Sequence, residues 1–208
     1  MPVTVRRRIA LLLGGCLVLG FGVALLLTAD LGSDGYTMLV HGVSLASGLP
    51  FWVANIVTAI AFVALAALRR LRPGPGTIVQ IVLVGVVVTL LLKVLSTPDS
   101  LVARCALLAA ALVVLATGIA LYLGSHTGAG PAEAVGLAWD PPIPFKWSYS
   151  AVQFGGALVG WLLGATLGVG TIAVILLLGP TVDLVSRRLH LDVHQERVAE
   201  ASGTQPQD

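Results

Sequence analysis

The chain has 208 residues, of which 57% are hydrophobic and 11% are charged, and its formal net charge is +2. With a mean hydropathy of +0.96, too few charged residues are available to cover a soluble globular surface, which excludes that class. The small positive charge gives no reason to expect a nucleic-acid partner, and we expect the lipid bilayer to be the solvent of this chain.

Six apolar runs follow one another along the chain, each close to the roughly 20 residues that an α-helix needs to cross a bilayer. They cover residues 9–29, 51–68, 77–95, 101–123, 147–165 and 169–185. The runs are continuous rather than alternating, which excludes the strands of a membrane barrel. We therefore predict an all-α integral membrane protein with six transmembrane helices in one domain, residues 1–190, and a short polar tail, residues 191–208.

Basic residues predict the orientation of these helices, because Lys and Arg near helix ends resist translocation. If the N-terminus lies inside, ten of the twelve basic residues fall on the cytoplasmic side, and only Lys93 and Arg104 fall outside. We therefore expect both the N-terminus and the C-terminus to face the cytoplasm.

The two halves of the sequence resemble each other. The segment GVALLLTADLGSDG from Gly22 aligns with GIALYLGSHTGAGP from Gly118, and GPGTIVQIVLVG from Gly74 aligns with GVGTIAVILLLG in the second half. Each half, about 9–95 and about 101–188, holds three spans. Because three is an odd number, the second half enters the membrane from the opposite side. The sequence thus predicts a 3+3 inverted repeat, a construction common in secondary transporters.

Each half also contains a short segment after its first span. In the first half, Ser33 and Asp34 are favoured N-cap residues before an apolar helix from Tyr36 to about Leu45. In the second half, Pro131 suits the first turn of a helix, and Glu133 lies near the positive end of its dipole. Helices of roughly ten residues are too short to span a bilayer. Each is either a re-entrant half-helix or an amphipathic helix on the membrane surface.

If both short helices re-enter the bilayer, their N-termini meet near the midplane and form a candidate site for a small solute or anion. The candidate residues at the two turns are Asp30, Gly32, Ser33, Asp34, Gly35, His126, Gly128, Gly130, Pro131 and Glu133. Asp30 and His126 occupy equivalent positions at span ends, so each is either a titrating group of the site or an ordinary solvated residue.

Polar residues inside the spans add a second group of candidates. They are Asn55, Gln80, Tyr149 and Gln153. Such residues either line a solute pathway or form hydrogen bonds between neighbouring helices. Glycines 156, 160 and 164 are spaced four residues apart, which favours close helix packing and is compatible with a homodimer.

No motif predicts catalysis. The sequence contains no nucleotide-binding P-loop, no HExxH zinc motif and no GxSxG nucleophile elbow. We therefore expect neither an enzyme nor a bound metal or cofactor.

Four segments together resemble the bacterial YczE/YyaS/YitT group of membrane proteins, most closely its YczE-like branch. They are ADLGSDGYTMLVHGVS, RPGPGTIVQIVLVG, GAGPAEAVGL and GVGTIAVILLLGPTVDLV. The chain departs from that group at residues 35–37, where Pro followed by Trp-Asp is usual, and at Glu133, where Asp is usual. The resemblance implies a multi-pass protein of the bacterial cytoplasmic membrane, of largely undefined activity, with branches associated with secondary-metabolite production.

Two functions follow from these features. The first is a small secondary transporter or channel for an unidentified small solute or anion, driven by an ion gradient or by the gradient of the solute itself, since no ATPase motif is present. The alternative is a non-transporting accessory or scaffold protein that regulates a partner through its packed helices.

Overall fold

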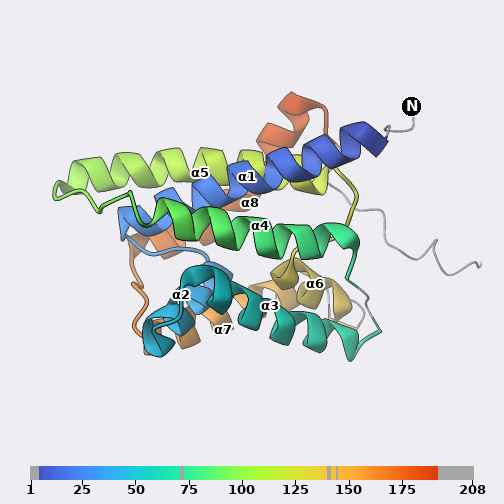
Figure 1. The fold of residues 1–208 in the computed structure, drawn as a ribbon, viewed down its shortest axis with the longest axis horizontal. Coiled ribbons are helices and arrows are strands. Elements are labelled where there is room, and N and C mark those ends of the chain that lie inside the picture. The colour runs from blue at the N-terminus through green and yellow to red at the C-terminus, as the bar shows by residue number, and fades with distance from the viewer. Residues whose placement is uncertain (1–4, 71–72, 140–141, 144, 192–208) are drawn as a thin grey trace, which may run out of the picture.

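The chain folds into helices only, as the computed structural model shows for residues 5–70, 73–139, 142–143 and 145–191, without the side chains of 145 and 146. These residues form eight α-helices and no β-strand (Figure 1). The helices are α1 (Val5–Ala29), α2 (Gly35–Ser47), α3 (Phe51–Ala67), α4 (Pro75–Leu91), α5 (Leu101–Leu123), α6 (Pro131–Ala138), α7 (Phe145–Leu162) and α8 (Val169–Leu189). The all-α prediction is confirmed, and the predicted tail beyond Leu191 lies outside the described residues.

Three of the described helices, α1, α5 and α8, are long and apolar enough to cross a membrane. Helices α3 and α4 are apolar but have 17 residues each, which is the lower limit for crossing about 30 Å of hydrocarbon. Helix α7 has 18 residues, but its first half carries Ser148, Tyr149 and Gln153. The six apolar runs are thus all helical, and three of them are clear spans.

Three helix C-termini differ by several residues from the apolar runs that predicted them. The run 147–165 ends as a helix at Leu162. The run 77–95 ends as a helix at Leu91, because the chain turns before Lys93 while its apolar residues continue. The run 169–185 extends to Leu189, since the last turn carries Arg187 and Arg188, which suit the negative end of a helix dipole. Hydropathy therefore located each helix, but it located the last turn only for α1, α3 and α5.

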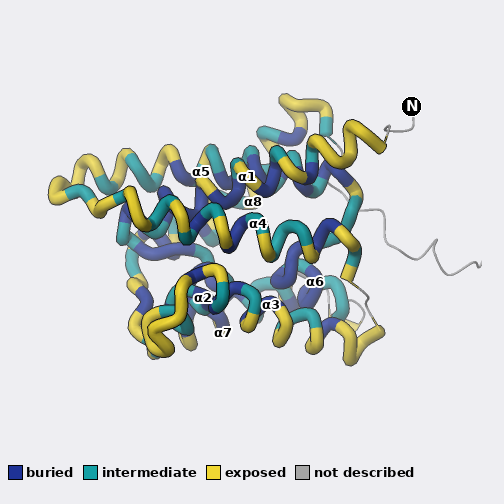
Figure 2. The backbone as a smooth tube through the Cα atoms, in the orientation of Figure 1, coloured by how far each residue is buried: buried dark blue, intermediate teal, exposed yellow. Residues whose placement is uncertain are grey.

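Large apolar side chains cover the outside of the helices. Val169, Val102 and Leu68 are exposed by 80%, 79% and 77%, and Figure 2 shows exposed residues along the outward faces of the helices. A soluble monomer rarely exposes apolar surface on this scale. Composition and surface together identify a membrane protein.

The helices form two layers in Figure 1, with α1, α4, α5 and α8 in one layer and α2, α3, α6 and α7 in the other. Helix α1 packs against α5 and α4, and α5 packs against α8, while α2 packs against α7 and α3 against α6. The α1–α5 contact is close because glycines lie in it. A Cβ atom on Gly118 would lie 2.5 Å from the backbone nitrogen of Leu19.

The loops that follow α1 and α5 dock in the same way on the starts of α8 and α4. The backbone N–H of Gly170 donates to the carbonyl of Leu31 at 2.8 Å, and the N–H of Gly76 donates to the carbonyl of Thr127 at 3.0 Å. Leu31 and Thr127 are equivalent in the aligned halves, and so are Gly76 and Gly170. The two loops therefore satisfy part of their backbone by reaching across to the other half of the chain.

The two loops also share a backbone conformation. Asp30 and His126 have φ angles of 49° and 52°, and Gly32 and Gly128 have φ angles of 100° and 141°. All four lie in the left-handed region, which glycine adopts at little cost. Of the four glycines predicted at the turns, Gly32 and Gly128 form them, whereas Gly35 begins α2 and Gly130 is the N-cap of α6.

The two short helices begin as the capping pattern predicts. Asp34 caps α2, because its Oδ2 accepts a hydrogen bond from the Thr37 N–H at 3.1 Å. Ser33 does not cap the helix and donates weakly to the Asp34 carbonyl at 3.5 Å. Pro131 occupies the start of α6 and Glu133 its first turn.

The glycine ridge of α7 packs within the molecule. Gly156 and Gly160 face α2, where a Cβ atom on Gly156 would lie 2.6 Å from the carbonyl oxygen of Gly35. Gly164 lies beyond the end of α7 and has open space beside it. The close packing predicted for this ridge is therefore a contact with α2 of the same chain. The homodimer stays a prediction.

Candidate functional site

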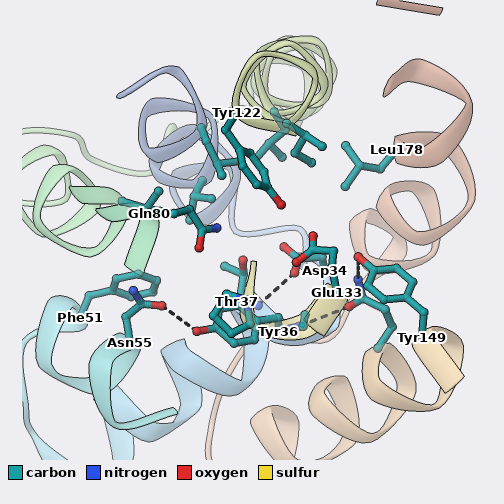
Figure 3. Close-up of a pocket in the computed structure, with 18 residues that line it drawn as sticks. Asp34, Tyr36, Thr37, Phe51, Asn55, Gln80, Tyr122, Glu133, Tyr149 and Leu178 are labelled. Atoms are coloured by element: carbon teal, nitrogen blue, oxygen red, sulfur yellow. Dashed lines mark hydrogen bonds between the residues drawn. The ribbon is translucent and has the colours of Figure 1, made fainter. Parts of the chain in front are cut away.

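A cavity of about 80 Å³ lies between the N-termini of α2 and α6 (Figure 3). Leu19 and Leu115, which line it, belong to the middle turns of α1 and α5. Its polar lining consists of Asp34, Tyr36, Thr37, Asn55, Gln80, Tyr122, Glu133, Tyr149 and Gln153. The cavity thus lies half-way along the two central helices and receives polar groups from both halves of the chain.

Two carboxyl groups face this cavity from the two short helices. Asp34 comes from the start of α2 and Glu133 from the first turn of α6, and Figure 3 shows both side chains at its centre. No Lys or Arg among the described residues lines the cavity. An ionised carboxylate in such surroundings is costly without a positive partner, so the pair needs a proton or a cation.

Gly130 makes room for one of these carboxyl groups. A Cβ atom at this position would lie 2.5 Å from Oε2 of Glu133 and 3.1 Å from the hydroxyl of Tyr122. Any side chain here would therefore displace the Glu133 carboxyl group. Gly130 thus contributes to the site by its lack of a side chain.

A hydrogen-bond network holds the polar wall beside the carboxyl groups. The Tyr36 hydroxyl donates to Oδ1 of Asn55 at 3.0 Å, and Nδ2 of Asn55 donates to the Ile81 carbonyl at 2.7 Å. Oε1 of Gln153 accepts from the Tyr36 N–H at 3.3 Å, and Nε2 of Gln153 donates to the Tyr149 hydroxyl at 2.8 Å. The network connects α2, α3, α4 and α7, so these side chains are oriented by their neighbours.

Two polar atoms at the cavity have no hydrogen-bond partner within the described part of the chain. They are Oε1 of Gln80 and the hydroxyl of Tyr122, whose residue is only 1% exposed. Figure 3 shows both side chains directed toward the cavity. Leaving such a group unpaired costs about 1–3 kcal/mol, so a native structure normally supplies water, an ion or a ligand there.

The structure brings together seven of the residues predicted from the sequence. Those that line the cavity are Asp34, Asn55, Gln80, Pro131, Glu133, Tyr149 and Gln153. Asp30, Gly32 and Ser33 line a smaller, separate cavity beside the turn after α1. The other predicted residues, Gly35, His126, Gly128 and Gly130, line neither cavity.

Asp30 is part of a separate link between three segments. Its Oδ2 forms an ion pair with Arg104 at 2.9 Å, and its Oδ1 accepts from the Thr166 hydroxyl at 2.5 Å. Arg104 also donates to the carbonyls of Ala29, at 2.7 Å, and of Asp30. His126, the equivalent residue of the second half, is exposed. Asp30 therefore joins the end of α1 to the start of α5, a role that neither of the two alternatives from the sequence included.

We expect Arg104→Met to lower the free energy of unfolding by about 1–2 kcal/mol, because it removes the donors that satisfy the end of α1. The Arg104 and Asp30 side chains are 24% and 45% exposed, so solvent screens their ion pair and the two carbonyl contacts carry most of the effect. The measurement is thermal unfolding of the purified protein in detergent. Lys93→Met, at an exposed position just after α4, is the control. Equal losses of stability in both variants would contradict the prediction.

Among the polar residues of the cavity, sequence reasoning missed three, Tyr36, Thr37 and Tyr122. The last of these carries a usable signal, since a tyrosine inside an apolar span needs a partner for its hydroxyl. Tyr122 stands in the run GIALYLG, where it is the one hydrogen-bonding side chain. A tyrosine hydroxyl in an otherwise apolar run therefore indicates a polar cavity between the helices.

Comparison with known proteins gives a family but no activity. A profile described as "Family of unknown function (DUF6198)" matches residues 6–187. An uncharacterized protein of Haemophilus influenzae is 26% identical over 191 residues, which cover 89% of this chain and 88% of that protein. No solved structure matches the chain. Neither description names the YczE/YyaS/YitT group, so that relation stays a resemblance.

Proposed function

Because the chain belongs to this family of unknown function, we propose its role from its own residues: a small secondary transporter or channel that passes a small solute through the central cavity. The observation that carries the proposal is the convergence of Asp34 and Glu133, from the two short helices, on one internal cavity. Polar groups deep between apolar helices are costly and mark solute pathways in membrane proteins. Hydrogen bonding between helices accounts for Asn55 and Gln153, but a protein that only packs against a partner has no need of two carboxyl groups in an internal cavity that no basic side chain of the described residues lines.

We further propose that six spans form a 3+3 inverted repeat. The packing of α1 on α4 has a counterpart in α5 on α8, and that of α2 on α7 has one in α6 on α3. The reciprocal hydrogen bonds from Gly170 to Leu31 and from Gly76 to Thr127 support the same relation. Two such halves, related by an axis in the membrane plane, would rock about the central site.

In this arrangement α2 and α6 are re-entrant half-helices. They have 13 and 8 residues, too few to span a bilayer, and their first turns lie beside mid-helix residues of α1 and α5. The non-helical backbone before α2 is covered by α8, as the Leu31–Gly170 hydrogen bond indicates. Irregular backbone at membrane depth is tolerated only where protein or a watery cavity covers it. Both termini would face the bacterial cytoplasm.

Cysteine labelling tests whether the cavity is a solute pathway. We expect Gln80→Cys, in the cavity, to react with a water-soluble methanethiosulfonate, and Ile78→Cys, 60% exposed on the same helix, to resist it because it faces lipid. The exposed Cys105 is first replaced by serine, and the buried Cys16 is kept. A transported solute should slow the reaction at position 80 by several-fold.

Small ammonium, guanidinium, carboxylate and neutral amide compounds form the solute panel, and each is then tested for uptake into proteoliposomes. If position 80 reacts at the same rate with every solute and no uptake occurs, the transport proposal is wrong. The accessory or scaffold function would then be favoured.

A further inference from the structure

We propose that the central cavity binds a small organic cation bearing N–H donors, a primary ammonium or a guanidinium group, in exchange for a proton. This inference rests on the proposed function and names its solute class. It starts from two carboxyl groups and a buried, unpartnered tyrosine hydroxyl that face one small space.

The first argument is charge. The titratable side chains that line the cavity are the carboxyl groups of Asp34 and Glu133 and the hydroxyls of Tyr36, Tyr122 and Tyr149. Helices α1, α3, α4 and α8 contribute leucine, valine, phenylalanine, asparagine and glutamine, and no basic side chain among the described residues reaches it. Two ionised carboxylates cannot stay together there without positive charge. A bound cation or a proton has to supply that charge, so the arrival of a cation releases protons.

The second argument is hydrogen bonding. Oε1 of Gln80 can only accept, and the Tyr122 hydroxyl can accept as well as donate. Both lack a partner in the described structure, and carboxylate oxygens are acceptors too. A primary ammonium group brings three donors and a guanidinium group five, with no acceptor in either. Such a cation satisfies every group that the cavity leaves unpaired.

The third argument concerns anions, which the helix N-termini alone would favour. Two of the donors at the start of α2 are already used: the Thr37 N–H bonds to Asp34, and the Tyr36 N–H bonds to Gln153. Helix α6 begins with Pro131, which has no N–H. With two carboxyl groups added, the site repels an anion. Of the two solute types expected from the sequence, the cavity therefore favours a small solute of positive charge.

The cavity suits a small cation. Its volume of about 80 Å³ has room for several water molecules, since one water needs roughly 10–15 Å³ of such space. Ethylammonium and guanidinium, with three and four heavy atoms, fit this space and carry N–H donors, whereas tetraethylammonium has no N–H donor for the unpaired acceptors. The apolar lining of Leu19, Phe51 and Leu115 accommodates a short alkyl group.

The test measures proton release from the purified full-length protein in detergent, in weak buffer at pH 7 with a pH indicator. Adding ethylammonium chloride, or guanidinium chloride at millimolar concentration, should release about one proton per cation bound, and raising the pH by one unit should tighten binding about tenfold. Tetraethylammonium chloride and sodium acetate should release none. In D34N/E133Q, proton release should disappear, whereas Asp183→Asn, at an exposed carboxyl on α8, should behave as the wild type.

Tyr122→Phe is a second variant that tests the same site if the double variant fails to fold. It removes one hydroxyl from the cavity and should weaken ethylammonium binding about tenfold while thermal unfolding stays near the wild-type value. Absence of proton release from the wild-type protein with both cations would overturn the inference, and so would saturable binding of acetate at the carboxyl groups.

Proteoliposomes loaded with a pH indicator separate this inference from the proposed function. If cations release protons in detergent but drive no proton movement across the liposome membrane, the cation site stands and transport is wrong. If a neutral amide or a carboxylate is transported and ethylammonium neither binds nor competes, transport stands and the cation site is wrong.

Discussion

Gly160→Leu should prevent the protein from folding to a stable monodisperse form, with a loss of about 3 kcal/mol or more, the upper part of the range for overpacked cores. Gly160 lies where α7 meets α2, and a Cβ atom on it would overlap the carbonyl group of Met38. The obstacle is backbone, which cannot rotate aside as a side chain does. Because α2 carries Asp34, separating it from α7 would also dismantle the cavity.

Gly155→Leu is the matched control, since it lies on the same helix and nothing stands within 4 Å of a Cβ atom there. Both substitutions gain the same helix propensity, about 1 kcal/mol relative to glycine, so the difference between them reports packing alone. Size-exclusion profiles in detergent and thermal unfolding measure it. Equal stability of the two variants would show that α2 does not rest on α7 as described.

Much of the fold could be predicted because hydropathy and capping are local properties. The short helix after the first span was predicted from Tyr36 to about Leu45 with a cap at Ser33 or Asp34, and the structure has α2 at Gly35–Ser47 with Asp34 as its N-cap. The start of α6 at Pro131 was predicted for the same kind of reason. Each signal depends on a few neighbouring residues, which a single sequence contains.

The partners of these elements could not be predicted, because they depend on contacts between distant residues. The bond between Asp30 and Arg104 joins residues 74 apart in the sequence, and neither flanking segment carries a mark of it. The glycines of α7 predicted close packing but not that α2 would be the neighbour. Such pairings are set by the arrangement of helices in space.

The candidate site was predicted in composition and only partly in place. Asp34 and Glu133 were expected to meet because their helices begin at equivalent points of the repeat, and both line the cavity. The expected anion followed from helix dipoles alone. The sequence already placed Asp34 and Glu133 at the starts of the two short helices, where an ionised carboxylate repels an anion, and the structure shows that both side chains face the cavity.

Cysteines at the far ends of α2 and α6 should be labelled from opposite sides of the membrane. Ser47 ends α2 and is exposed, and Ile143 follows α6 and is 43% exposed. In spheroplasts, a membrane-impermeant maleimide should label Ser47→Cys and leave Ile143→Cys unlabelled, and in inverted vesicles the result should reverse. The reason is that three spans in each half, as proposed, would turn the second half over.

The reversal is expected to be all-or-none, because the hydrocarbon layer blocks a charged reagent completely on the far side. Cys105 is replaced by serine in both variants, and labelling after solubilisation in detergent confirms that each cysteine is reactive. Labelling of both positions from one side would require an even number of spans, two or four, in each half. The halves would then run parallel, Asp34 and Glu133 would approach from the same face, and a two-sided central site would lose its basis.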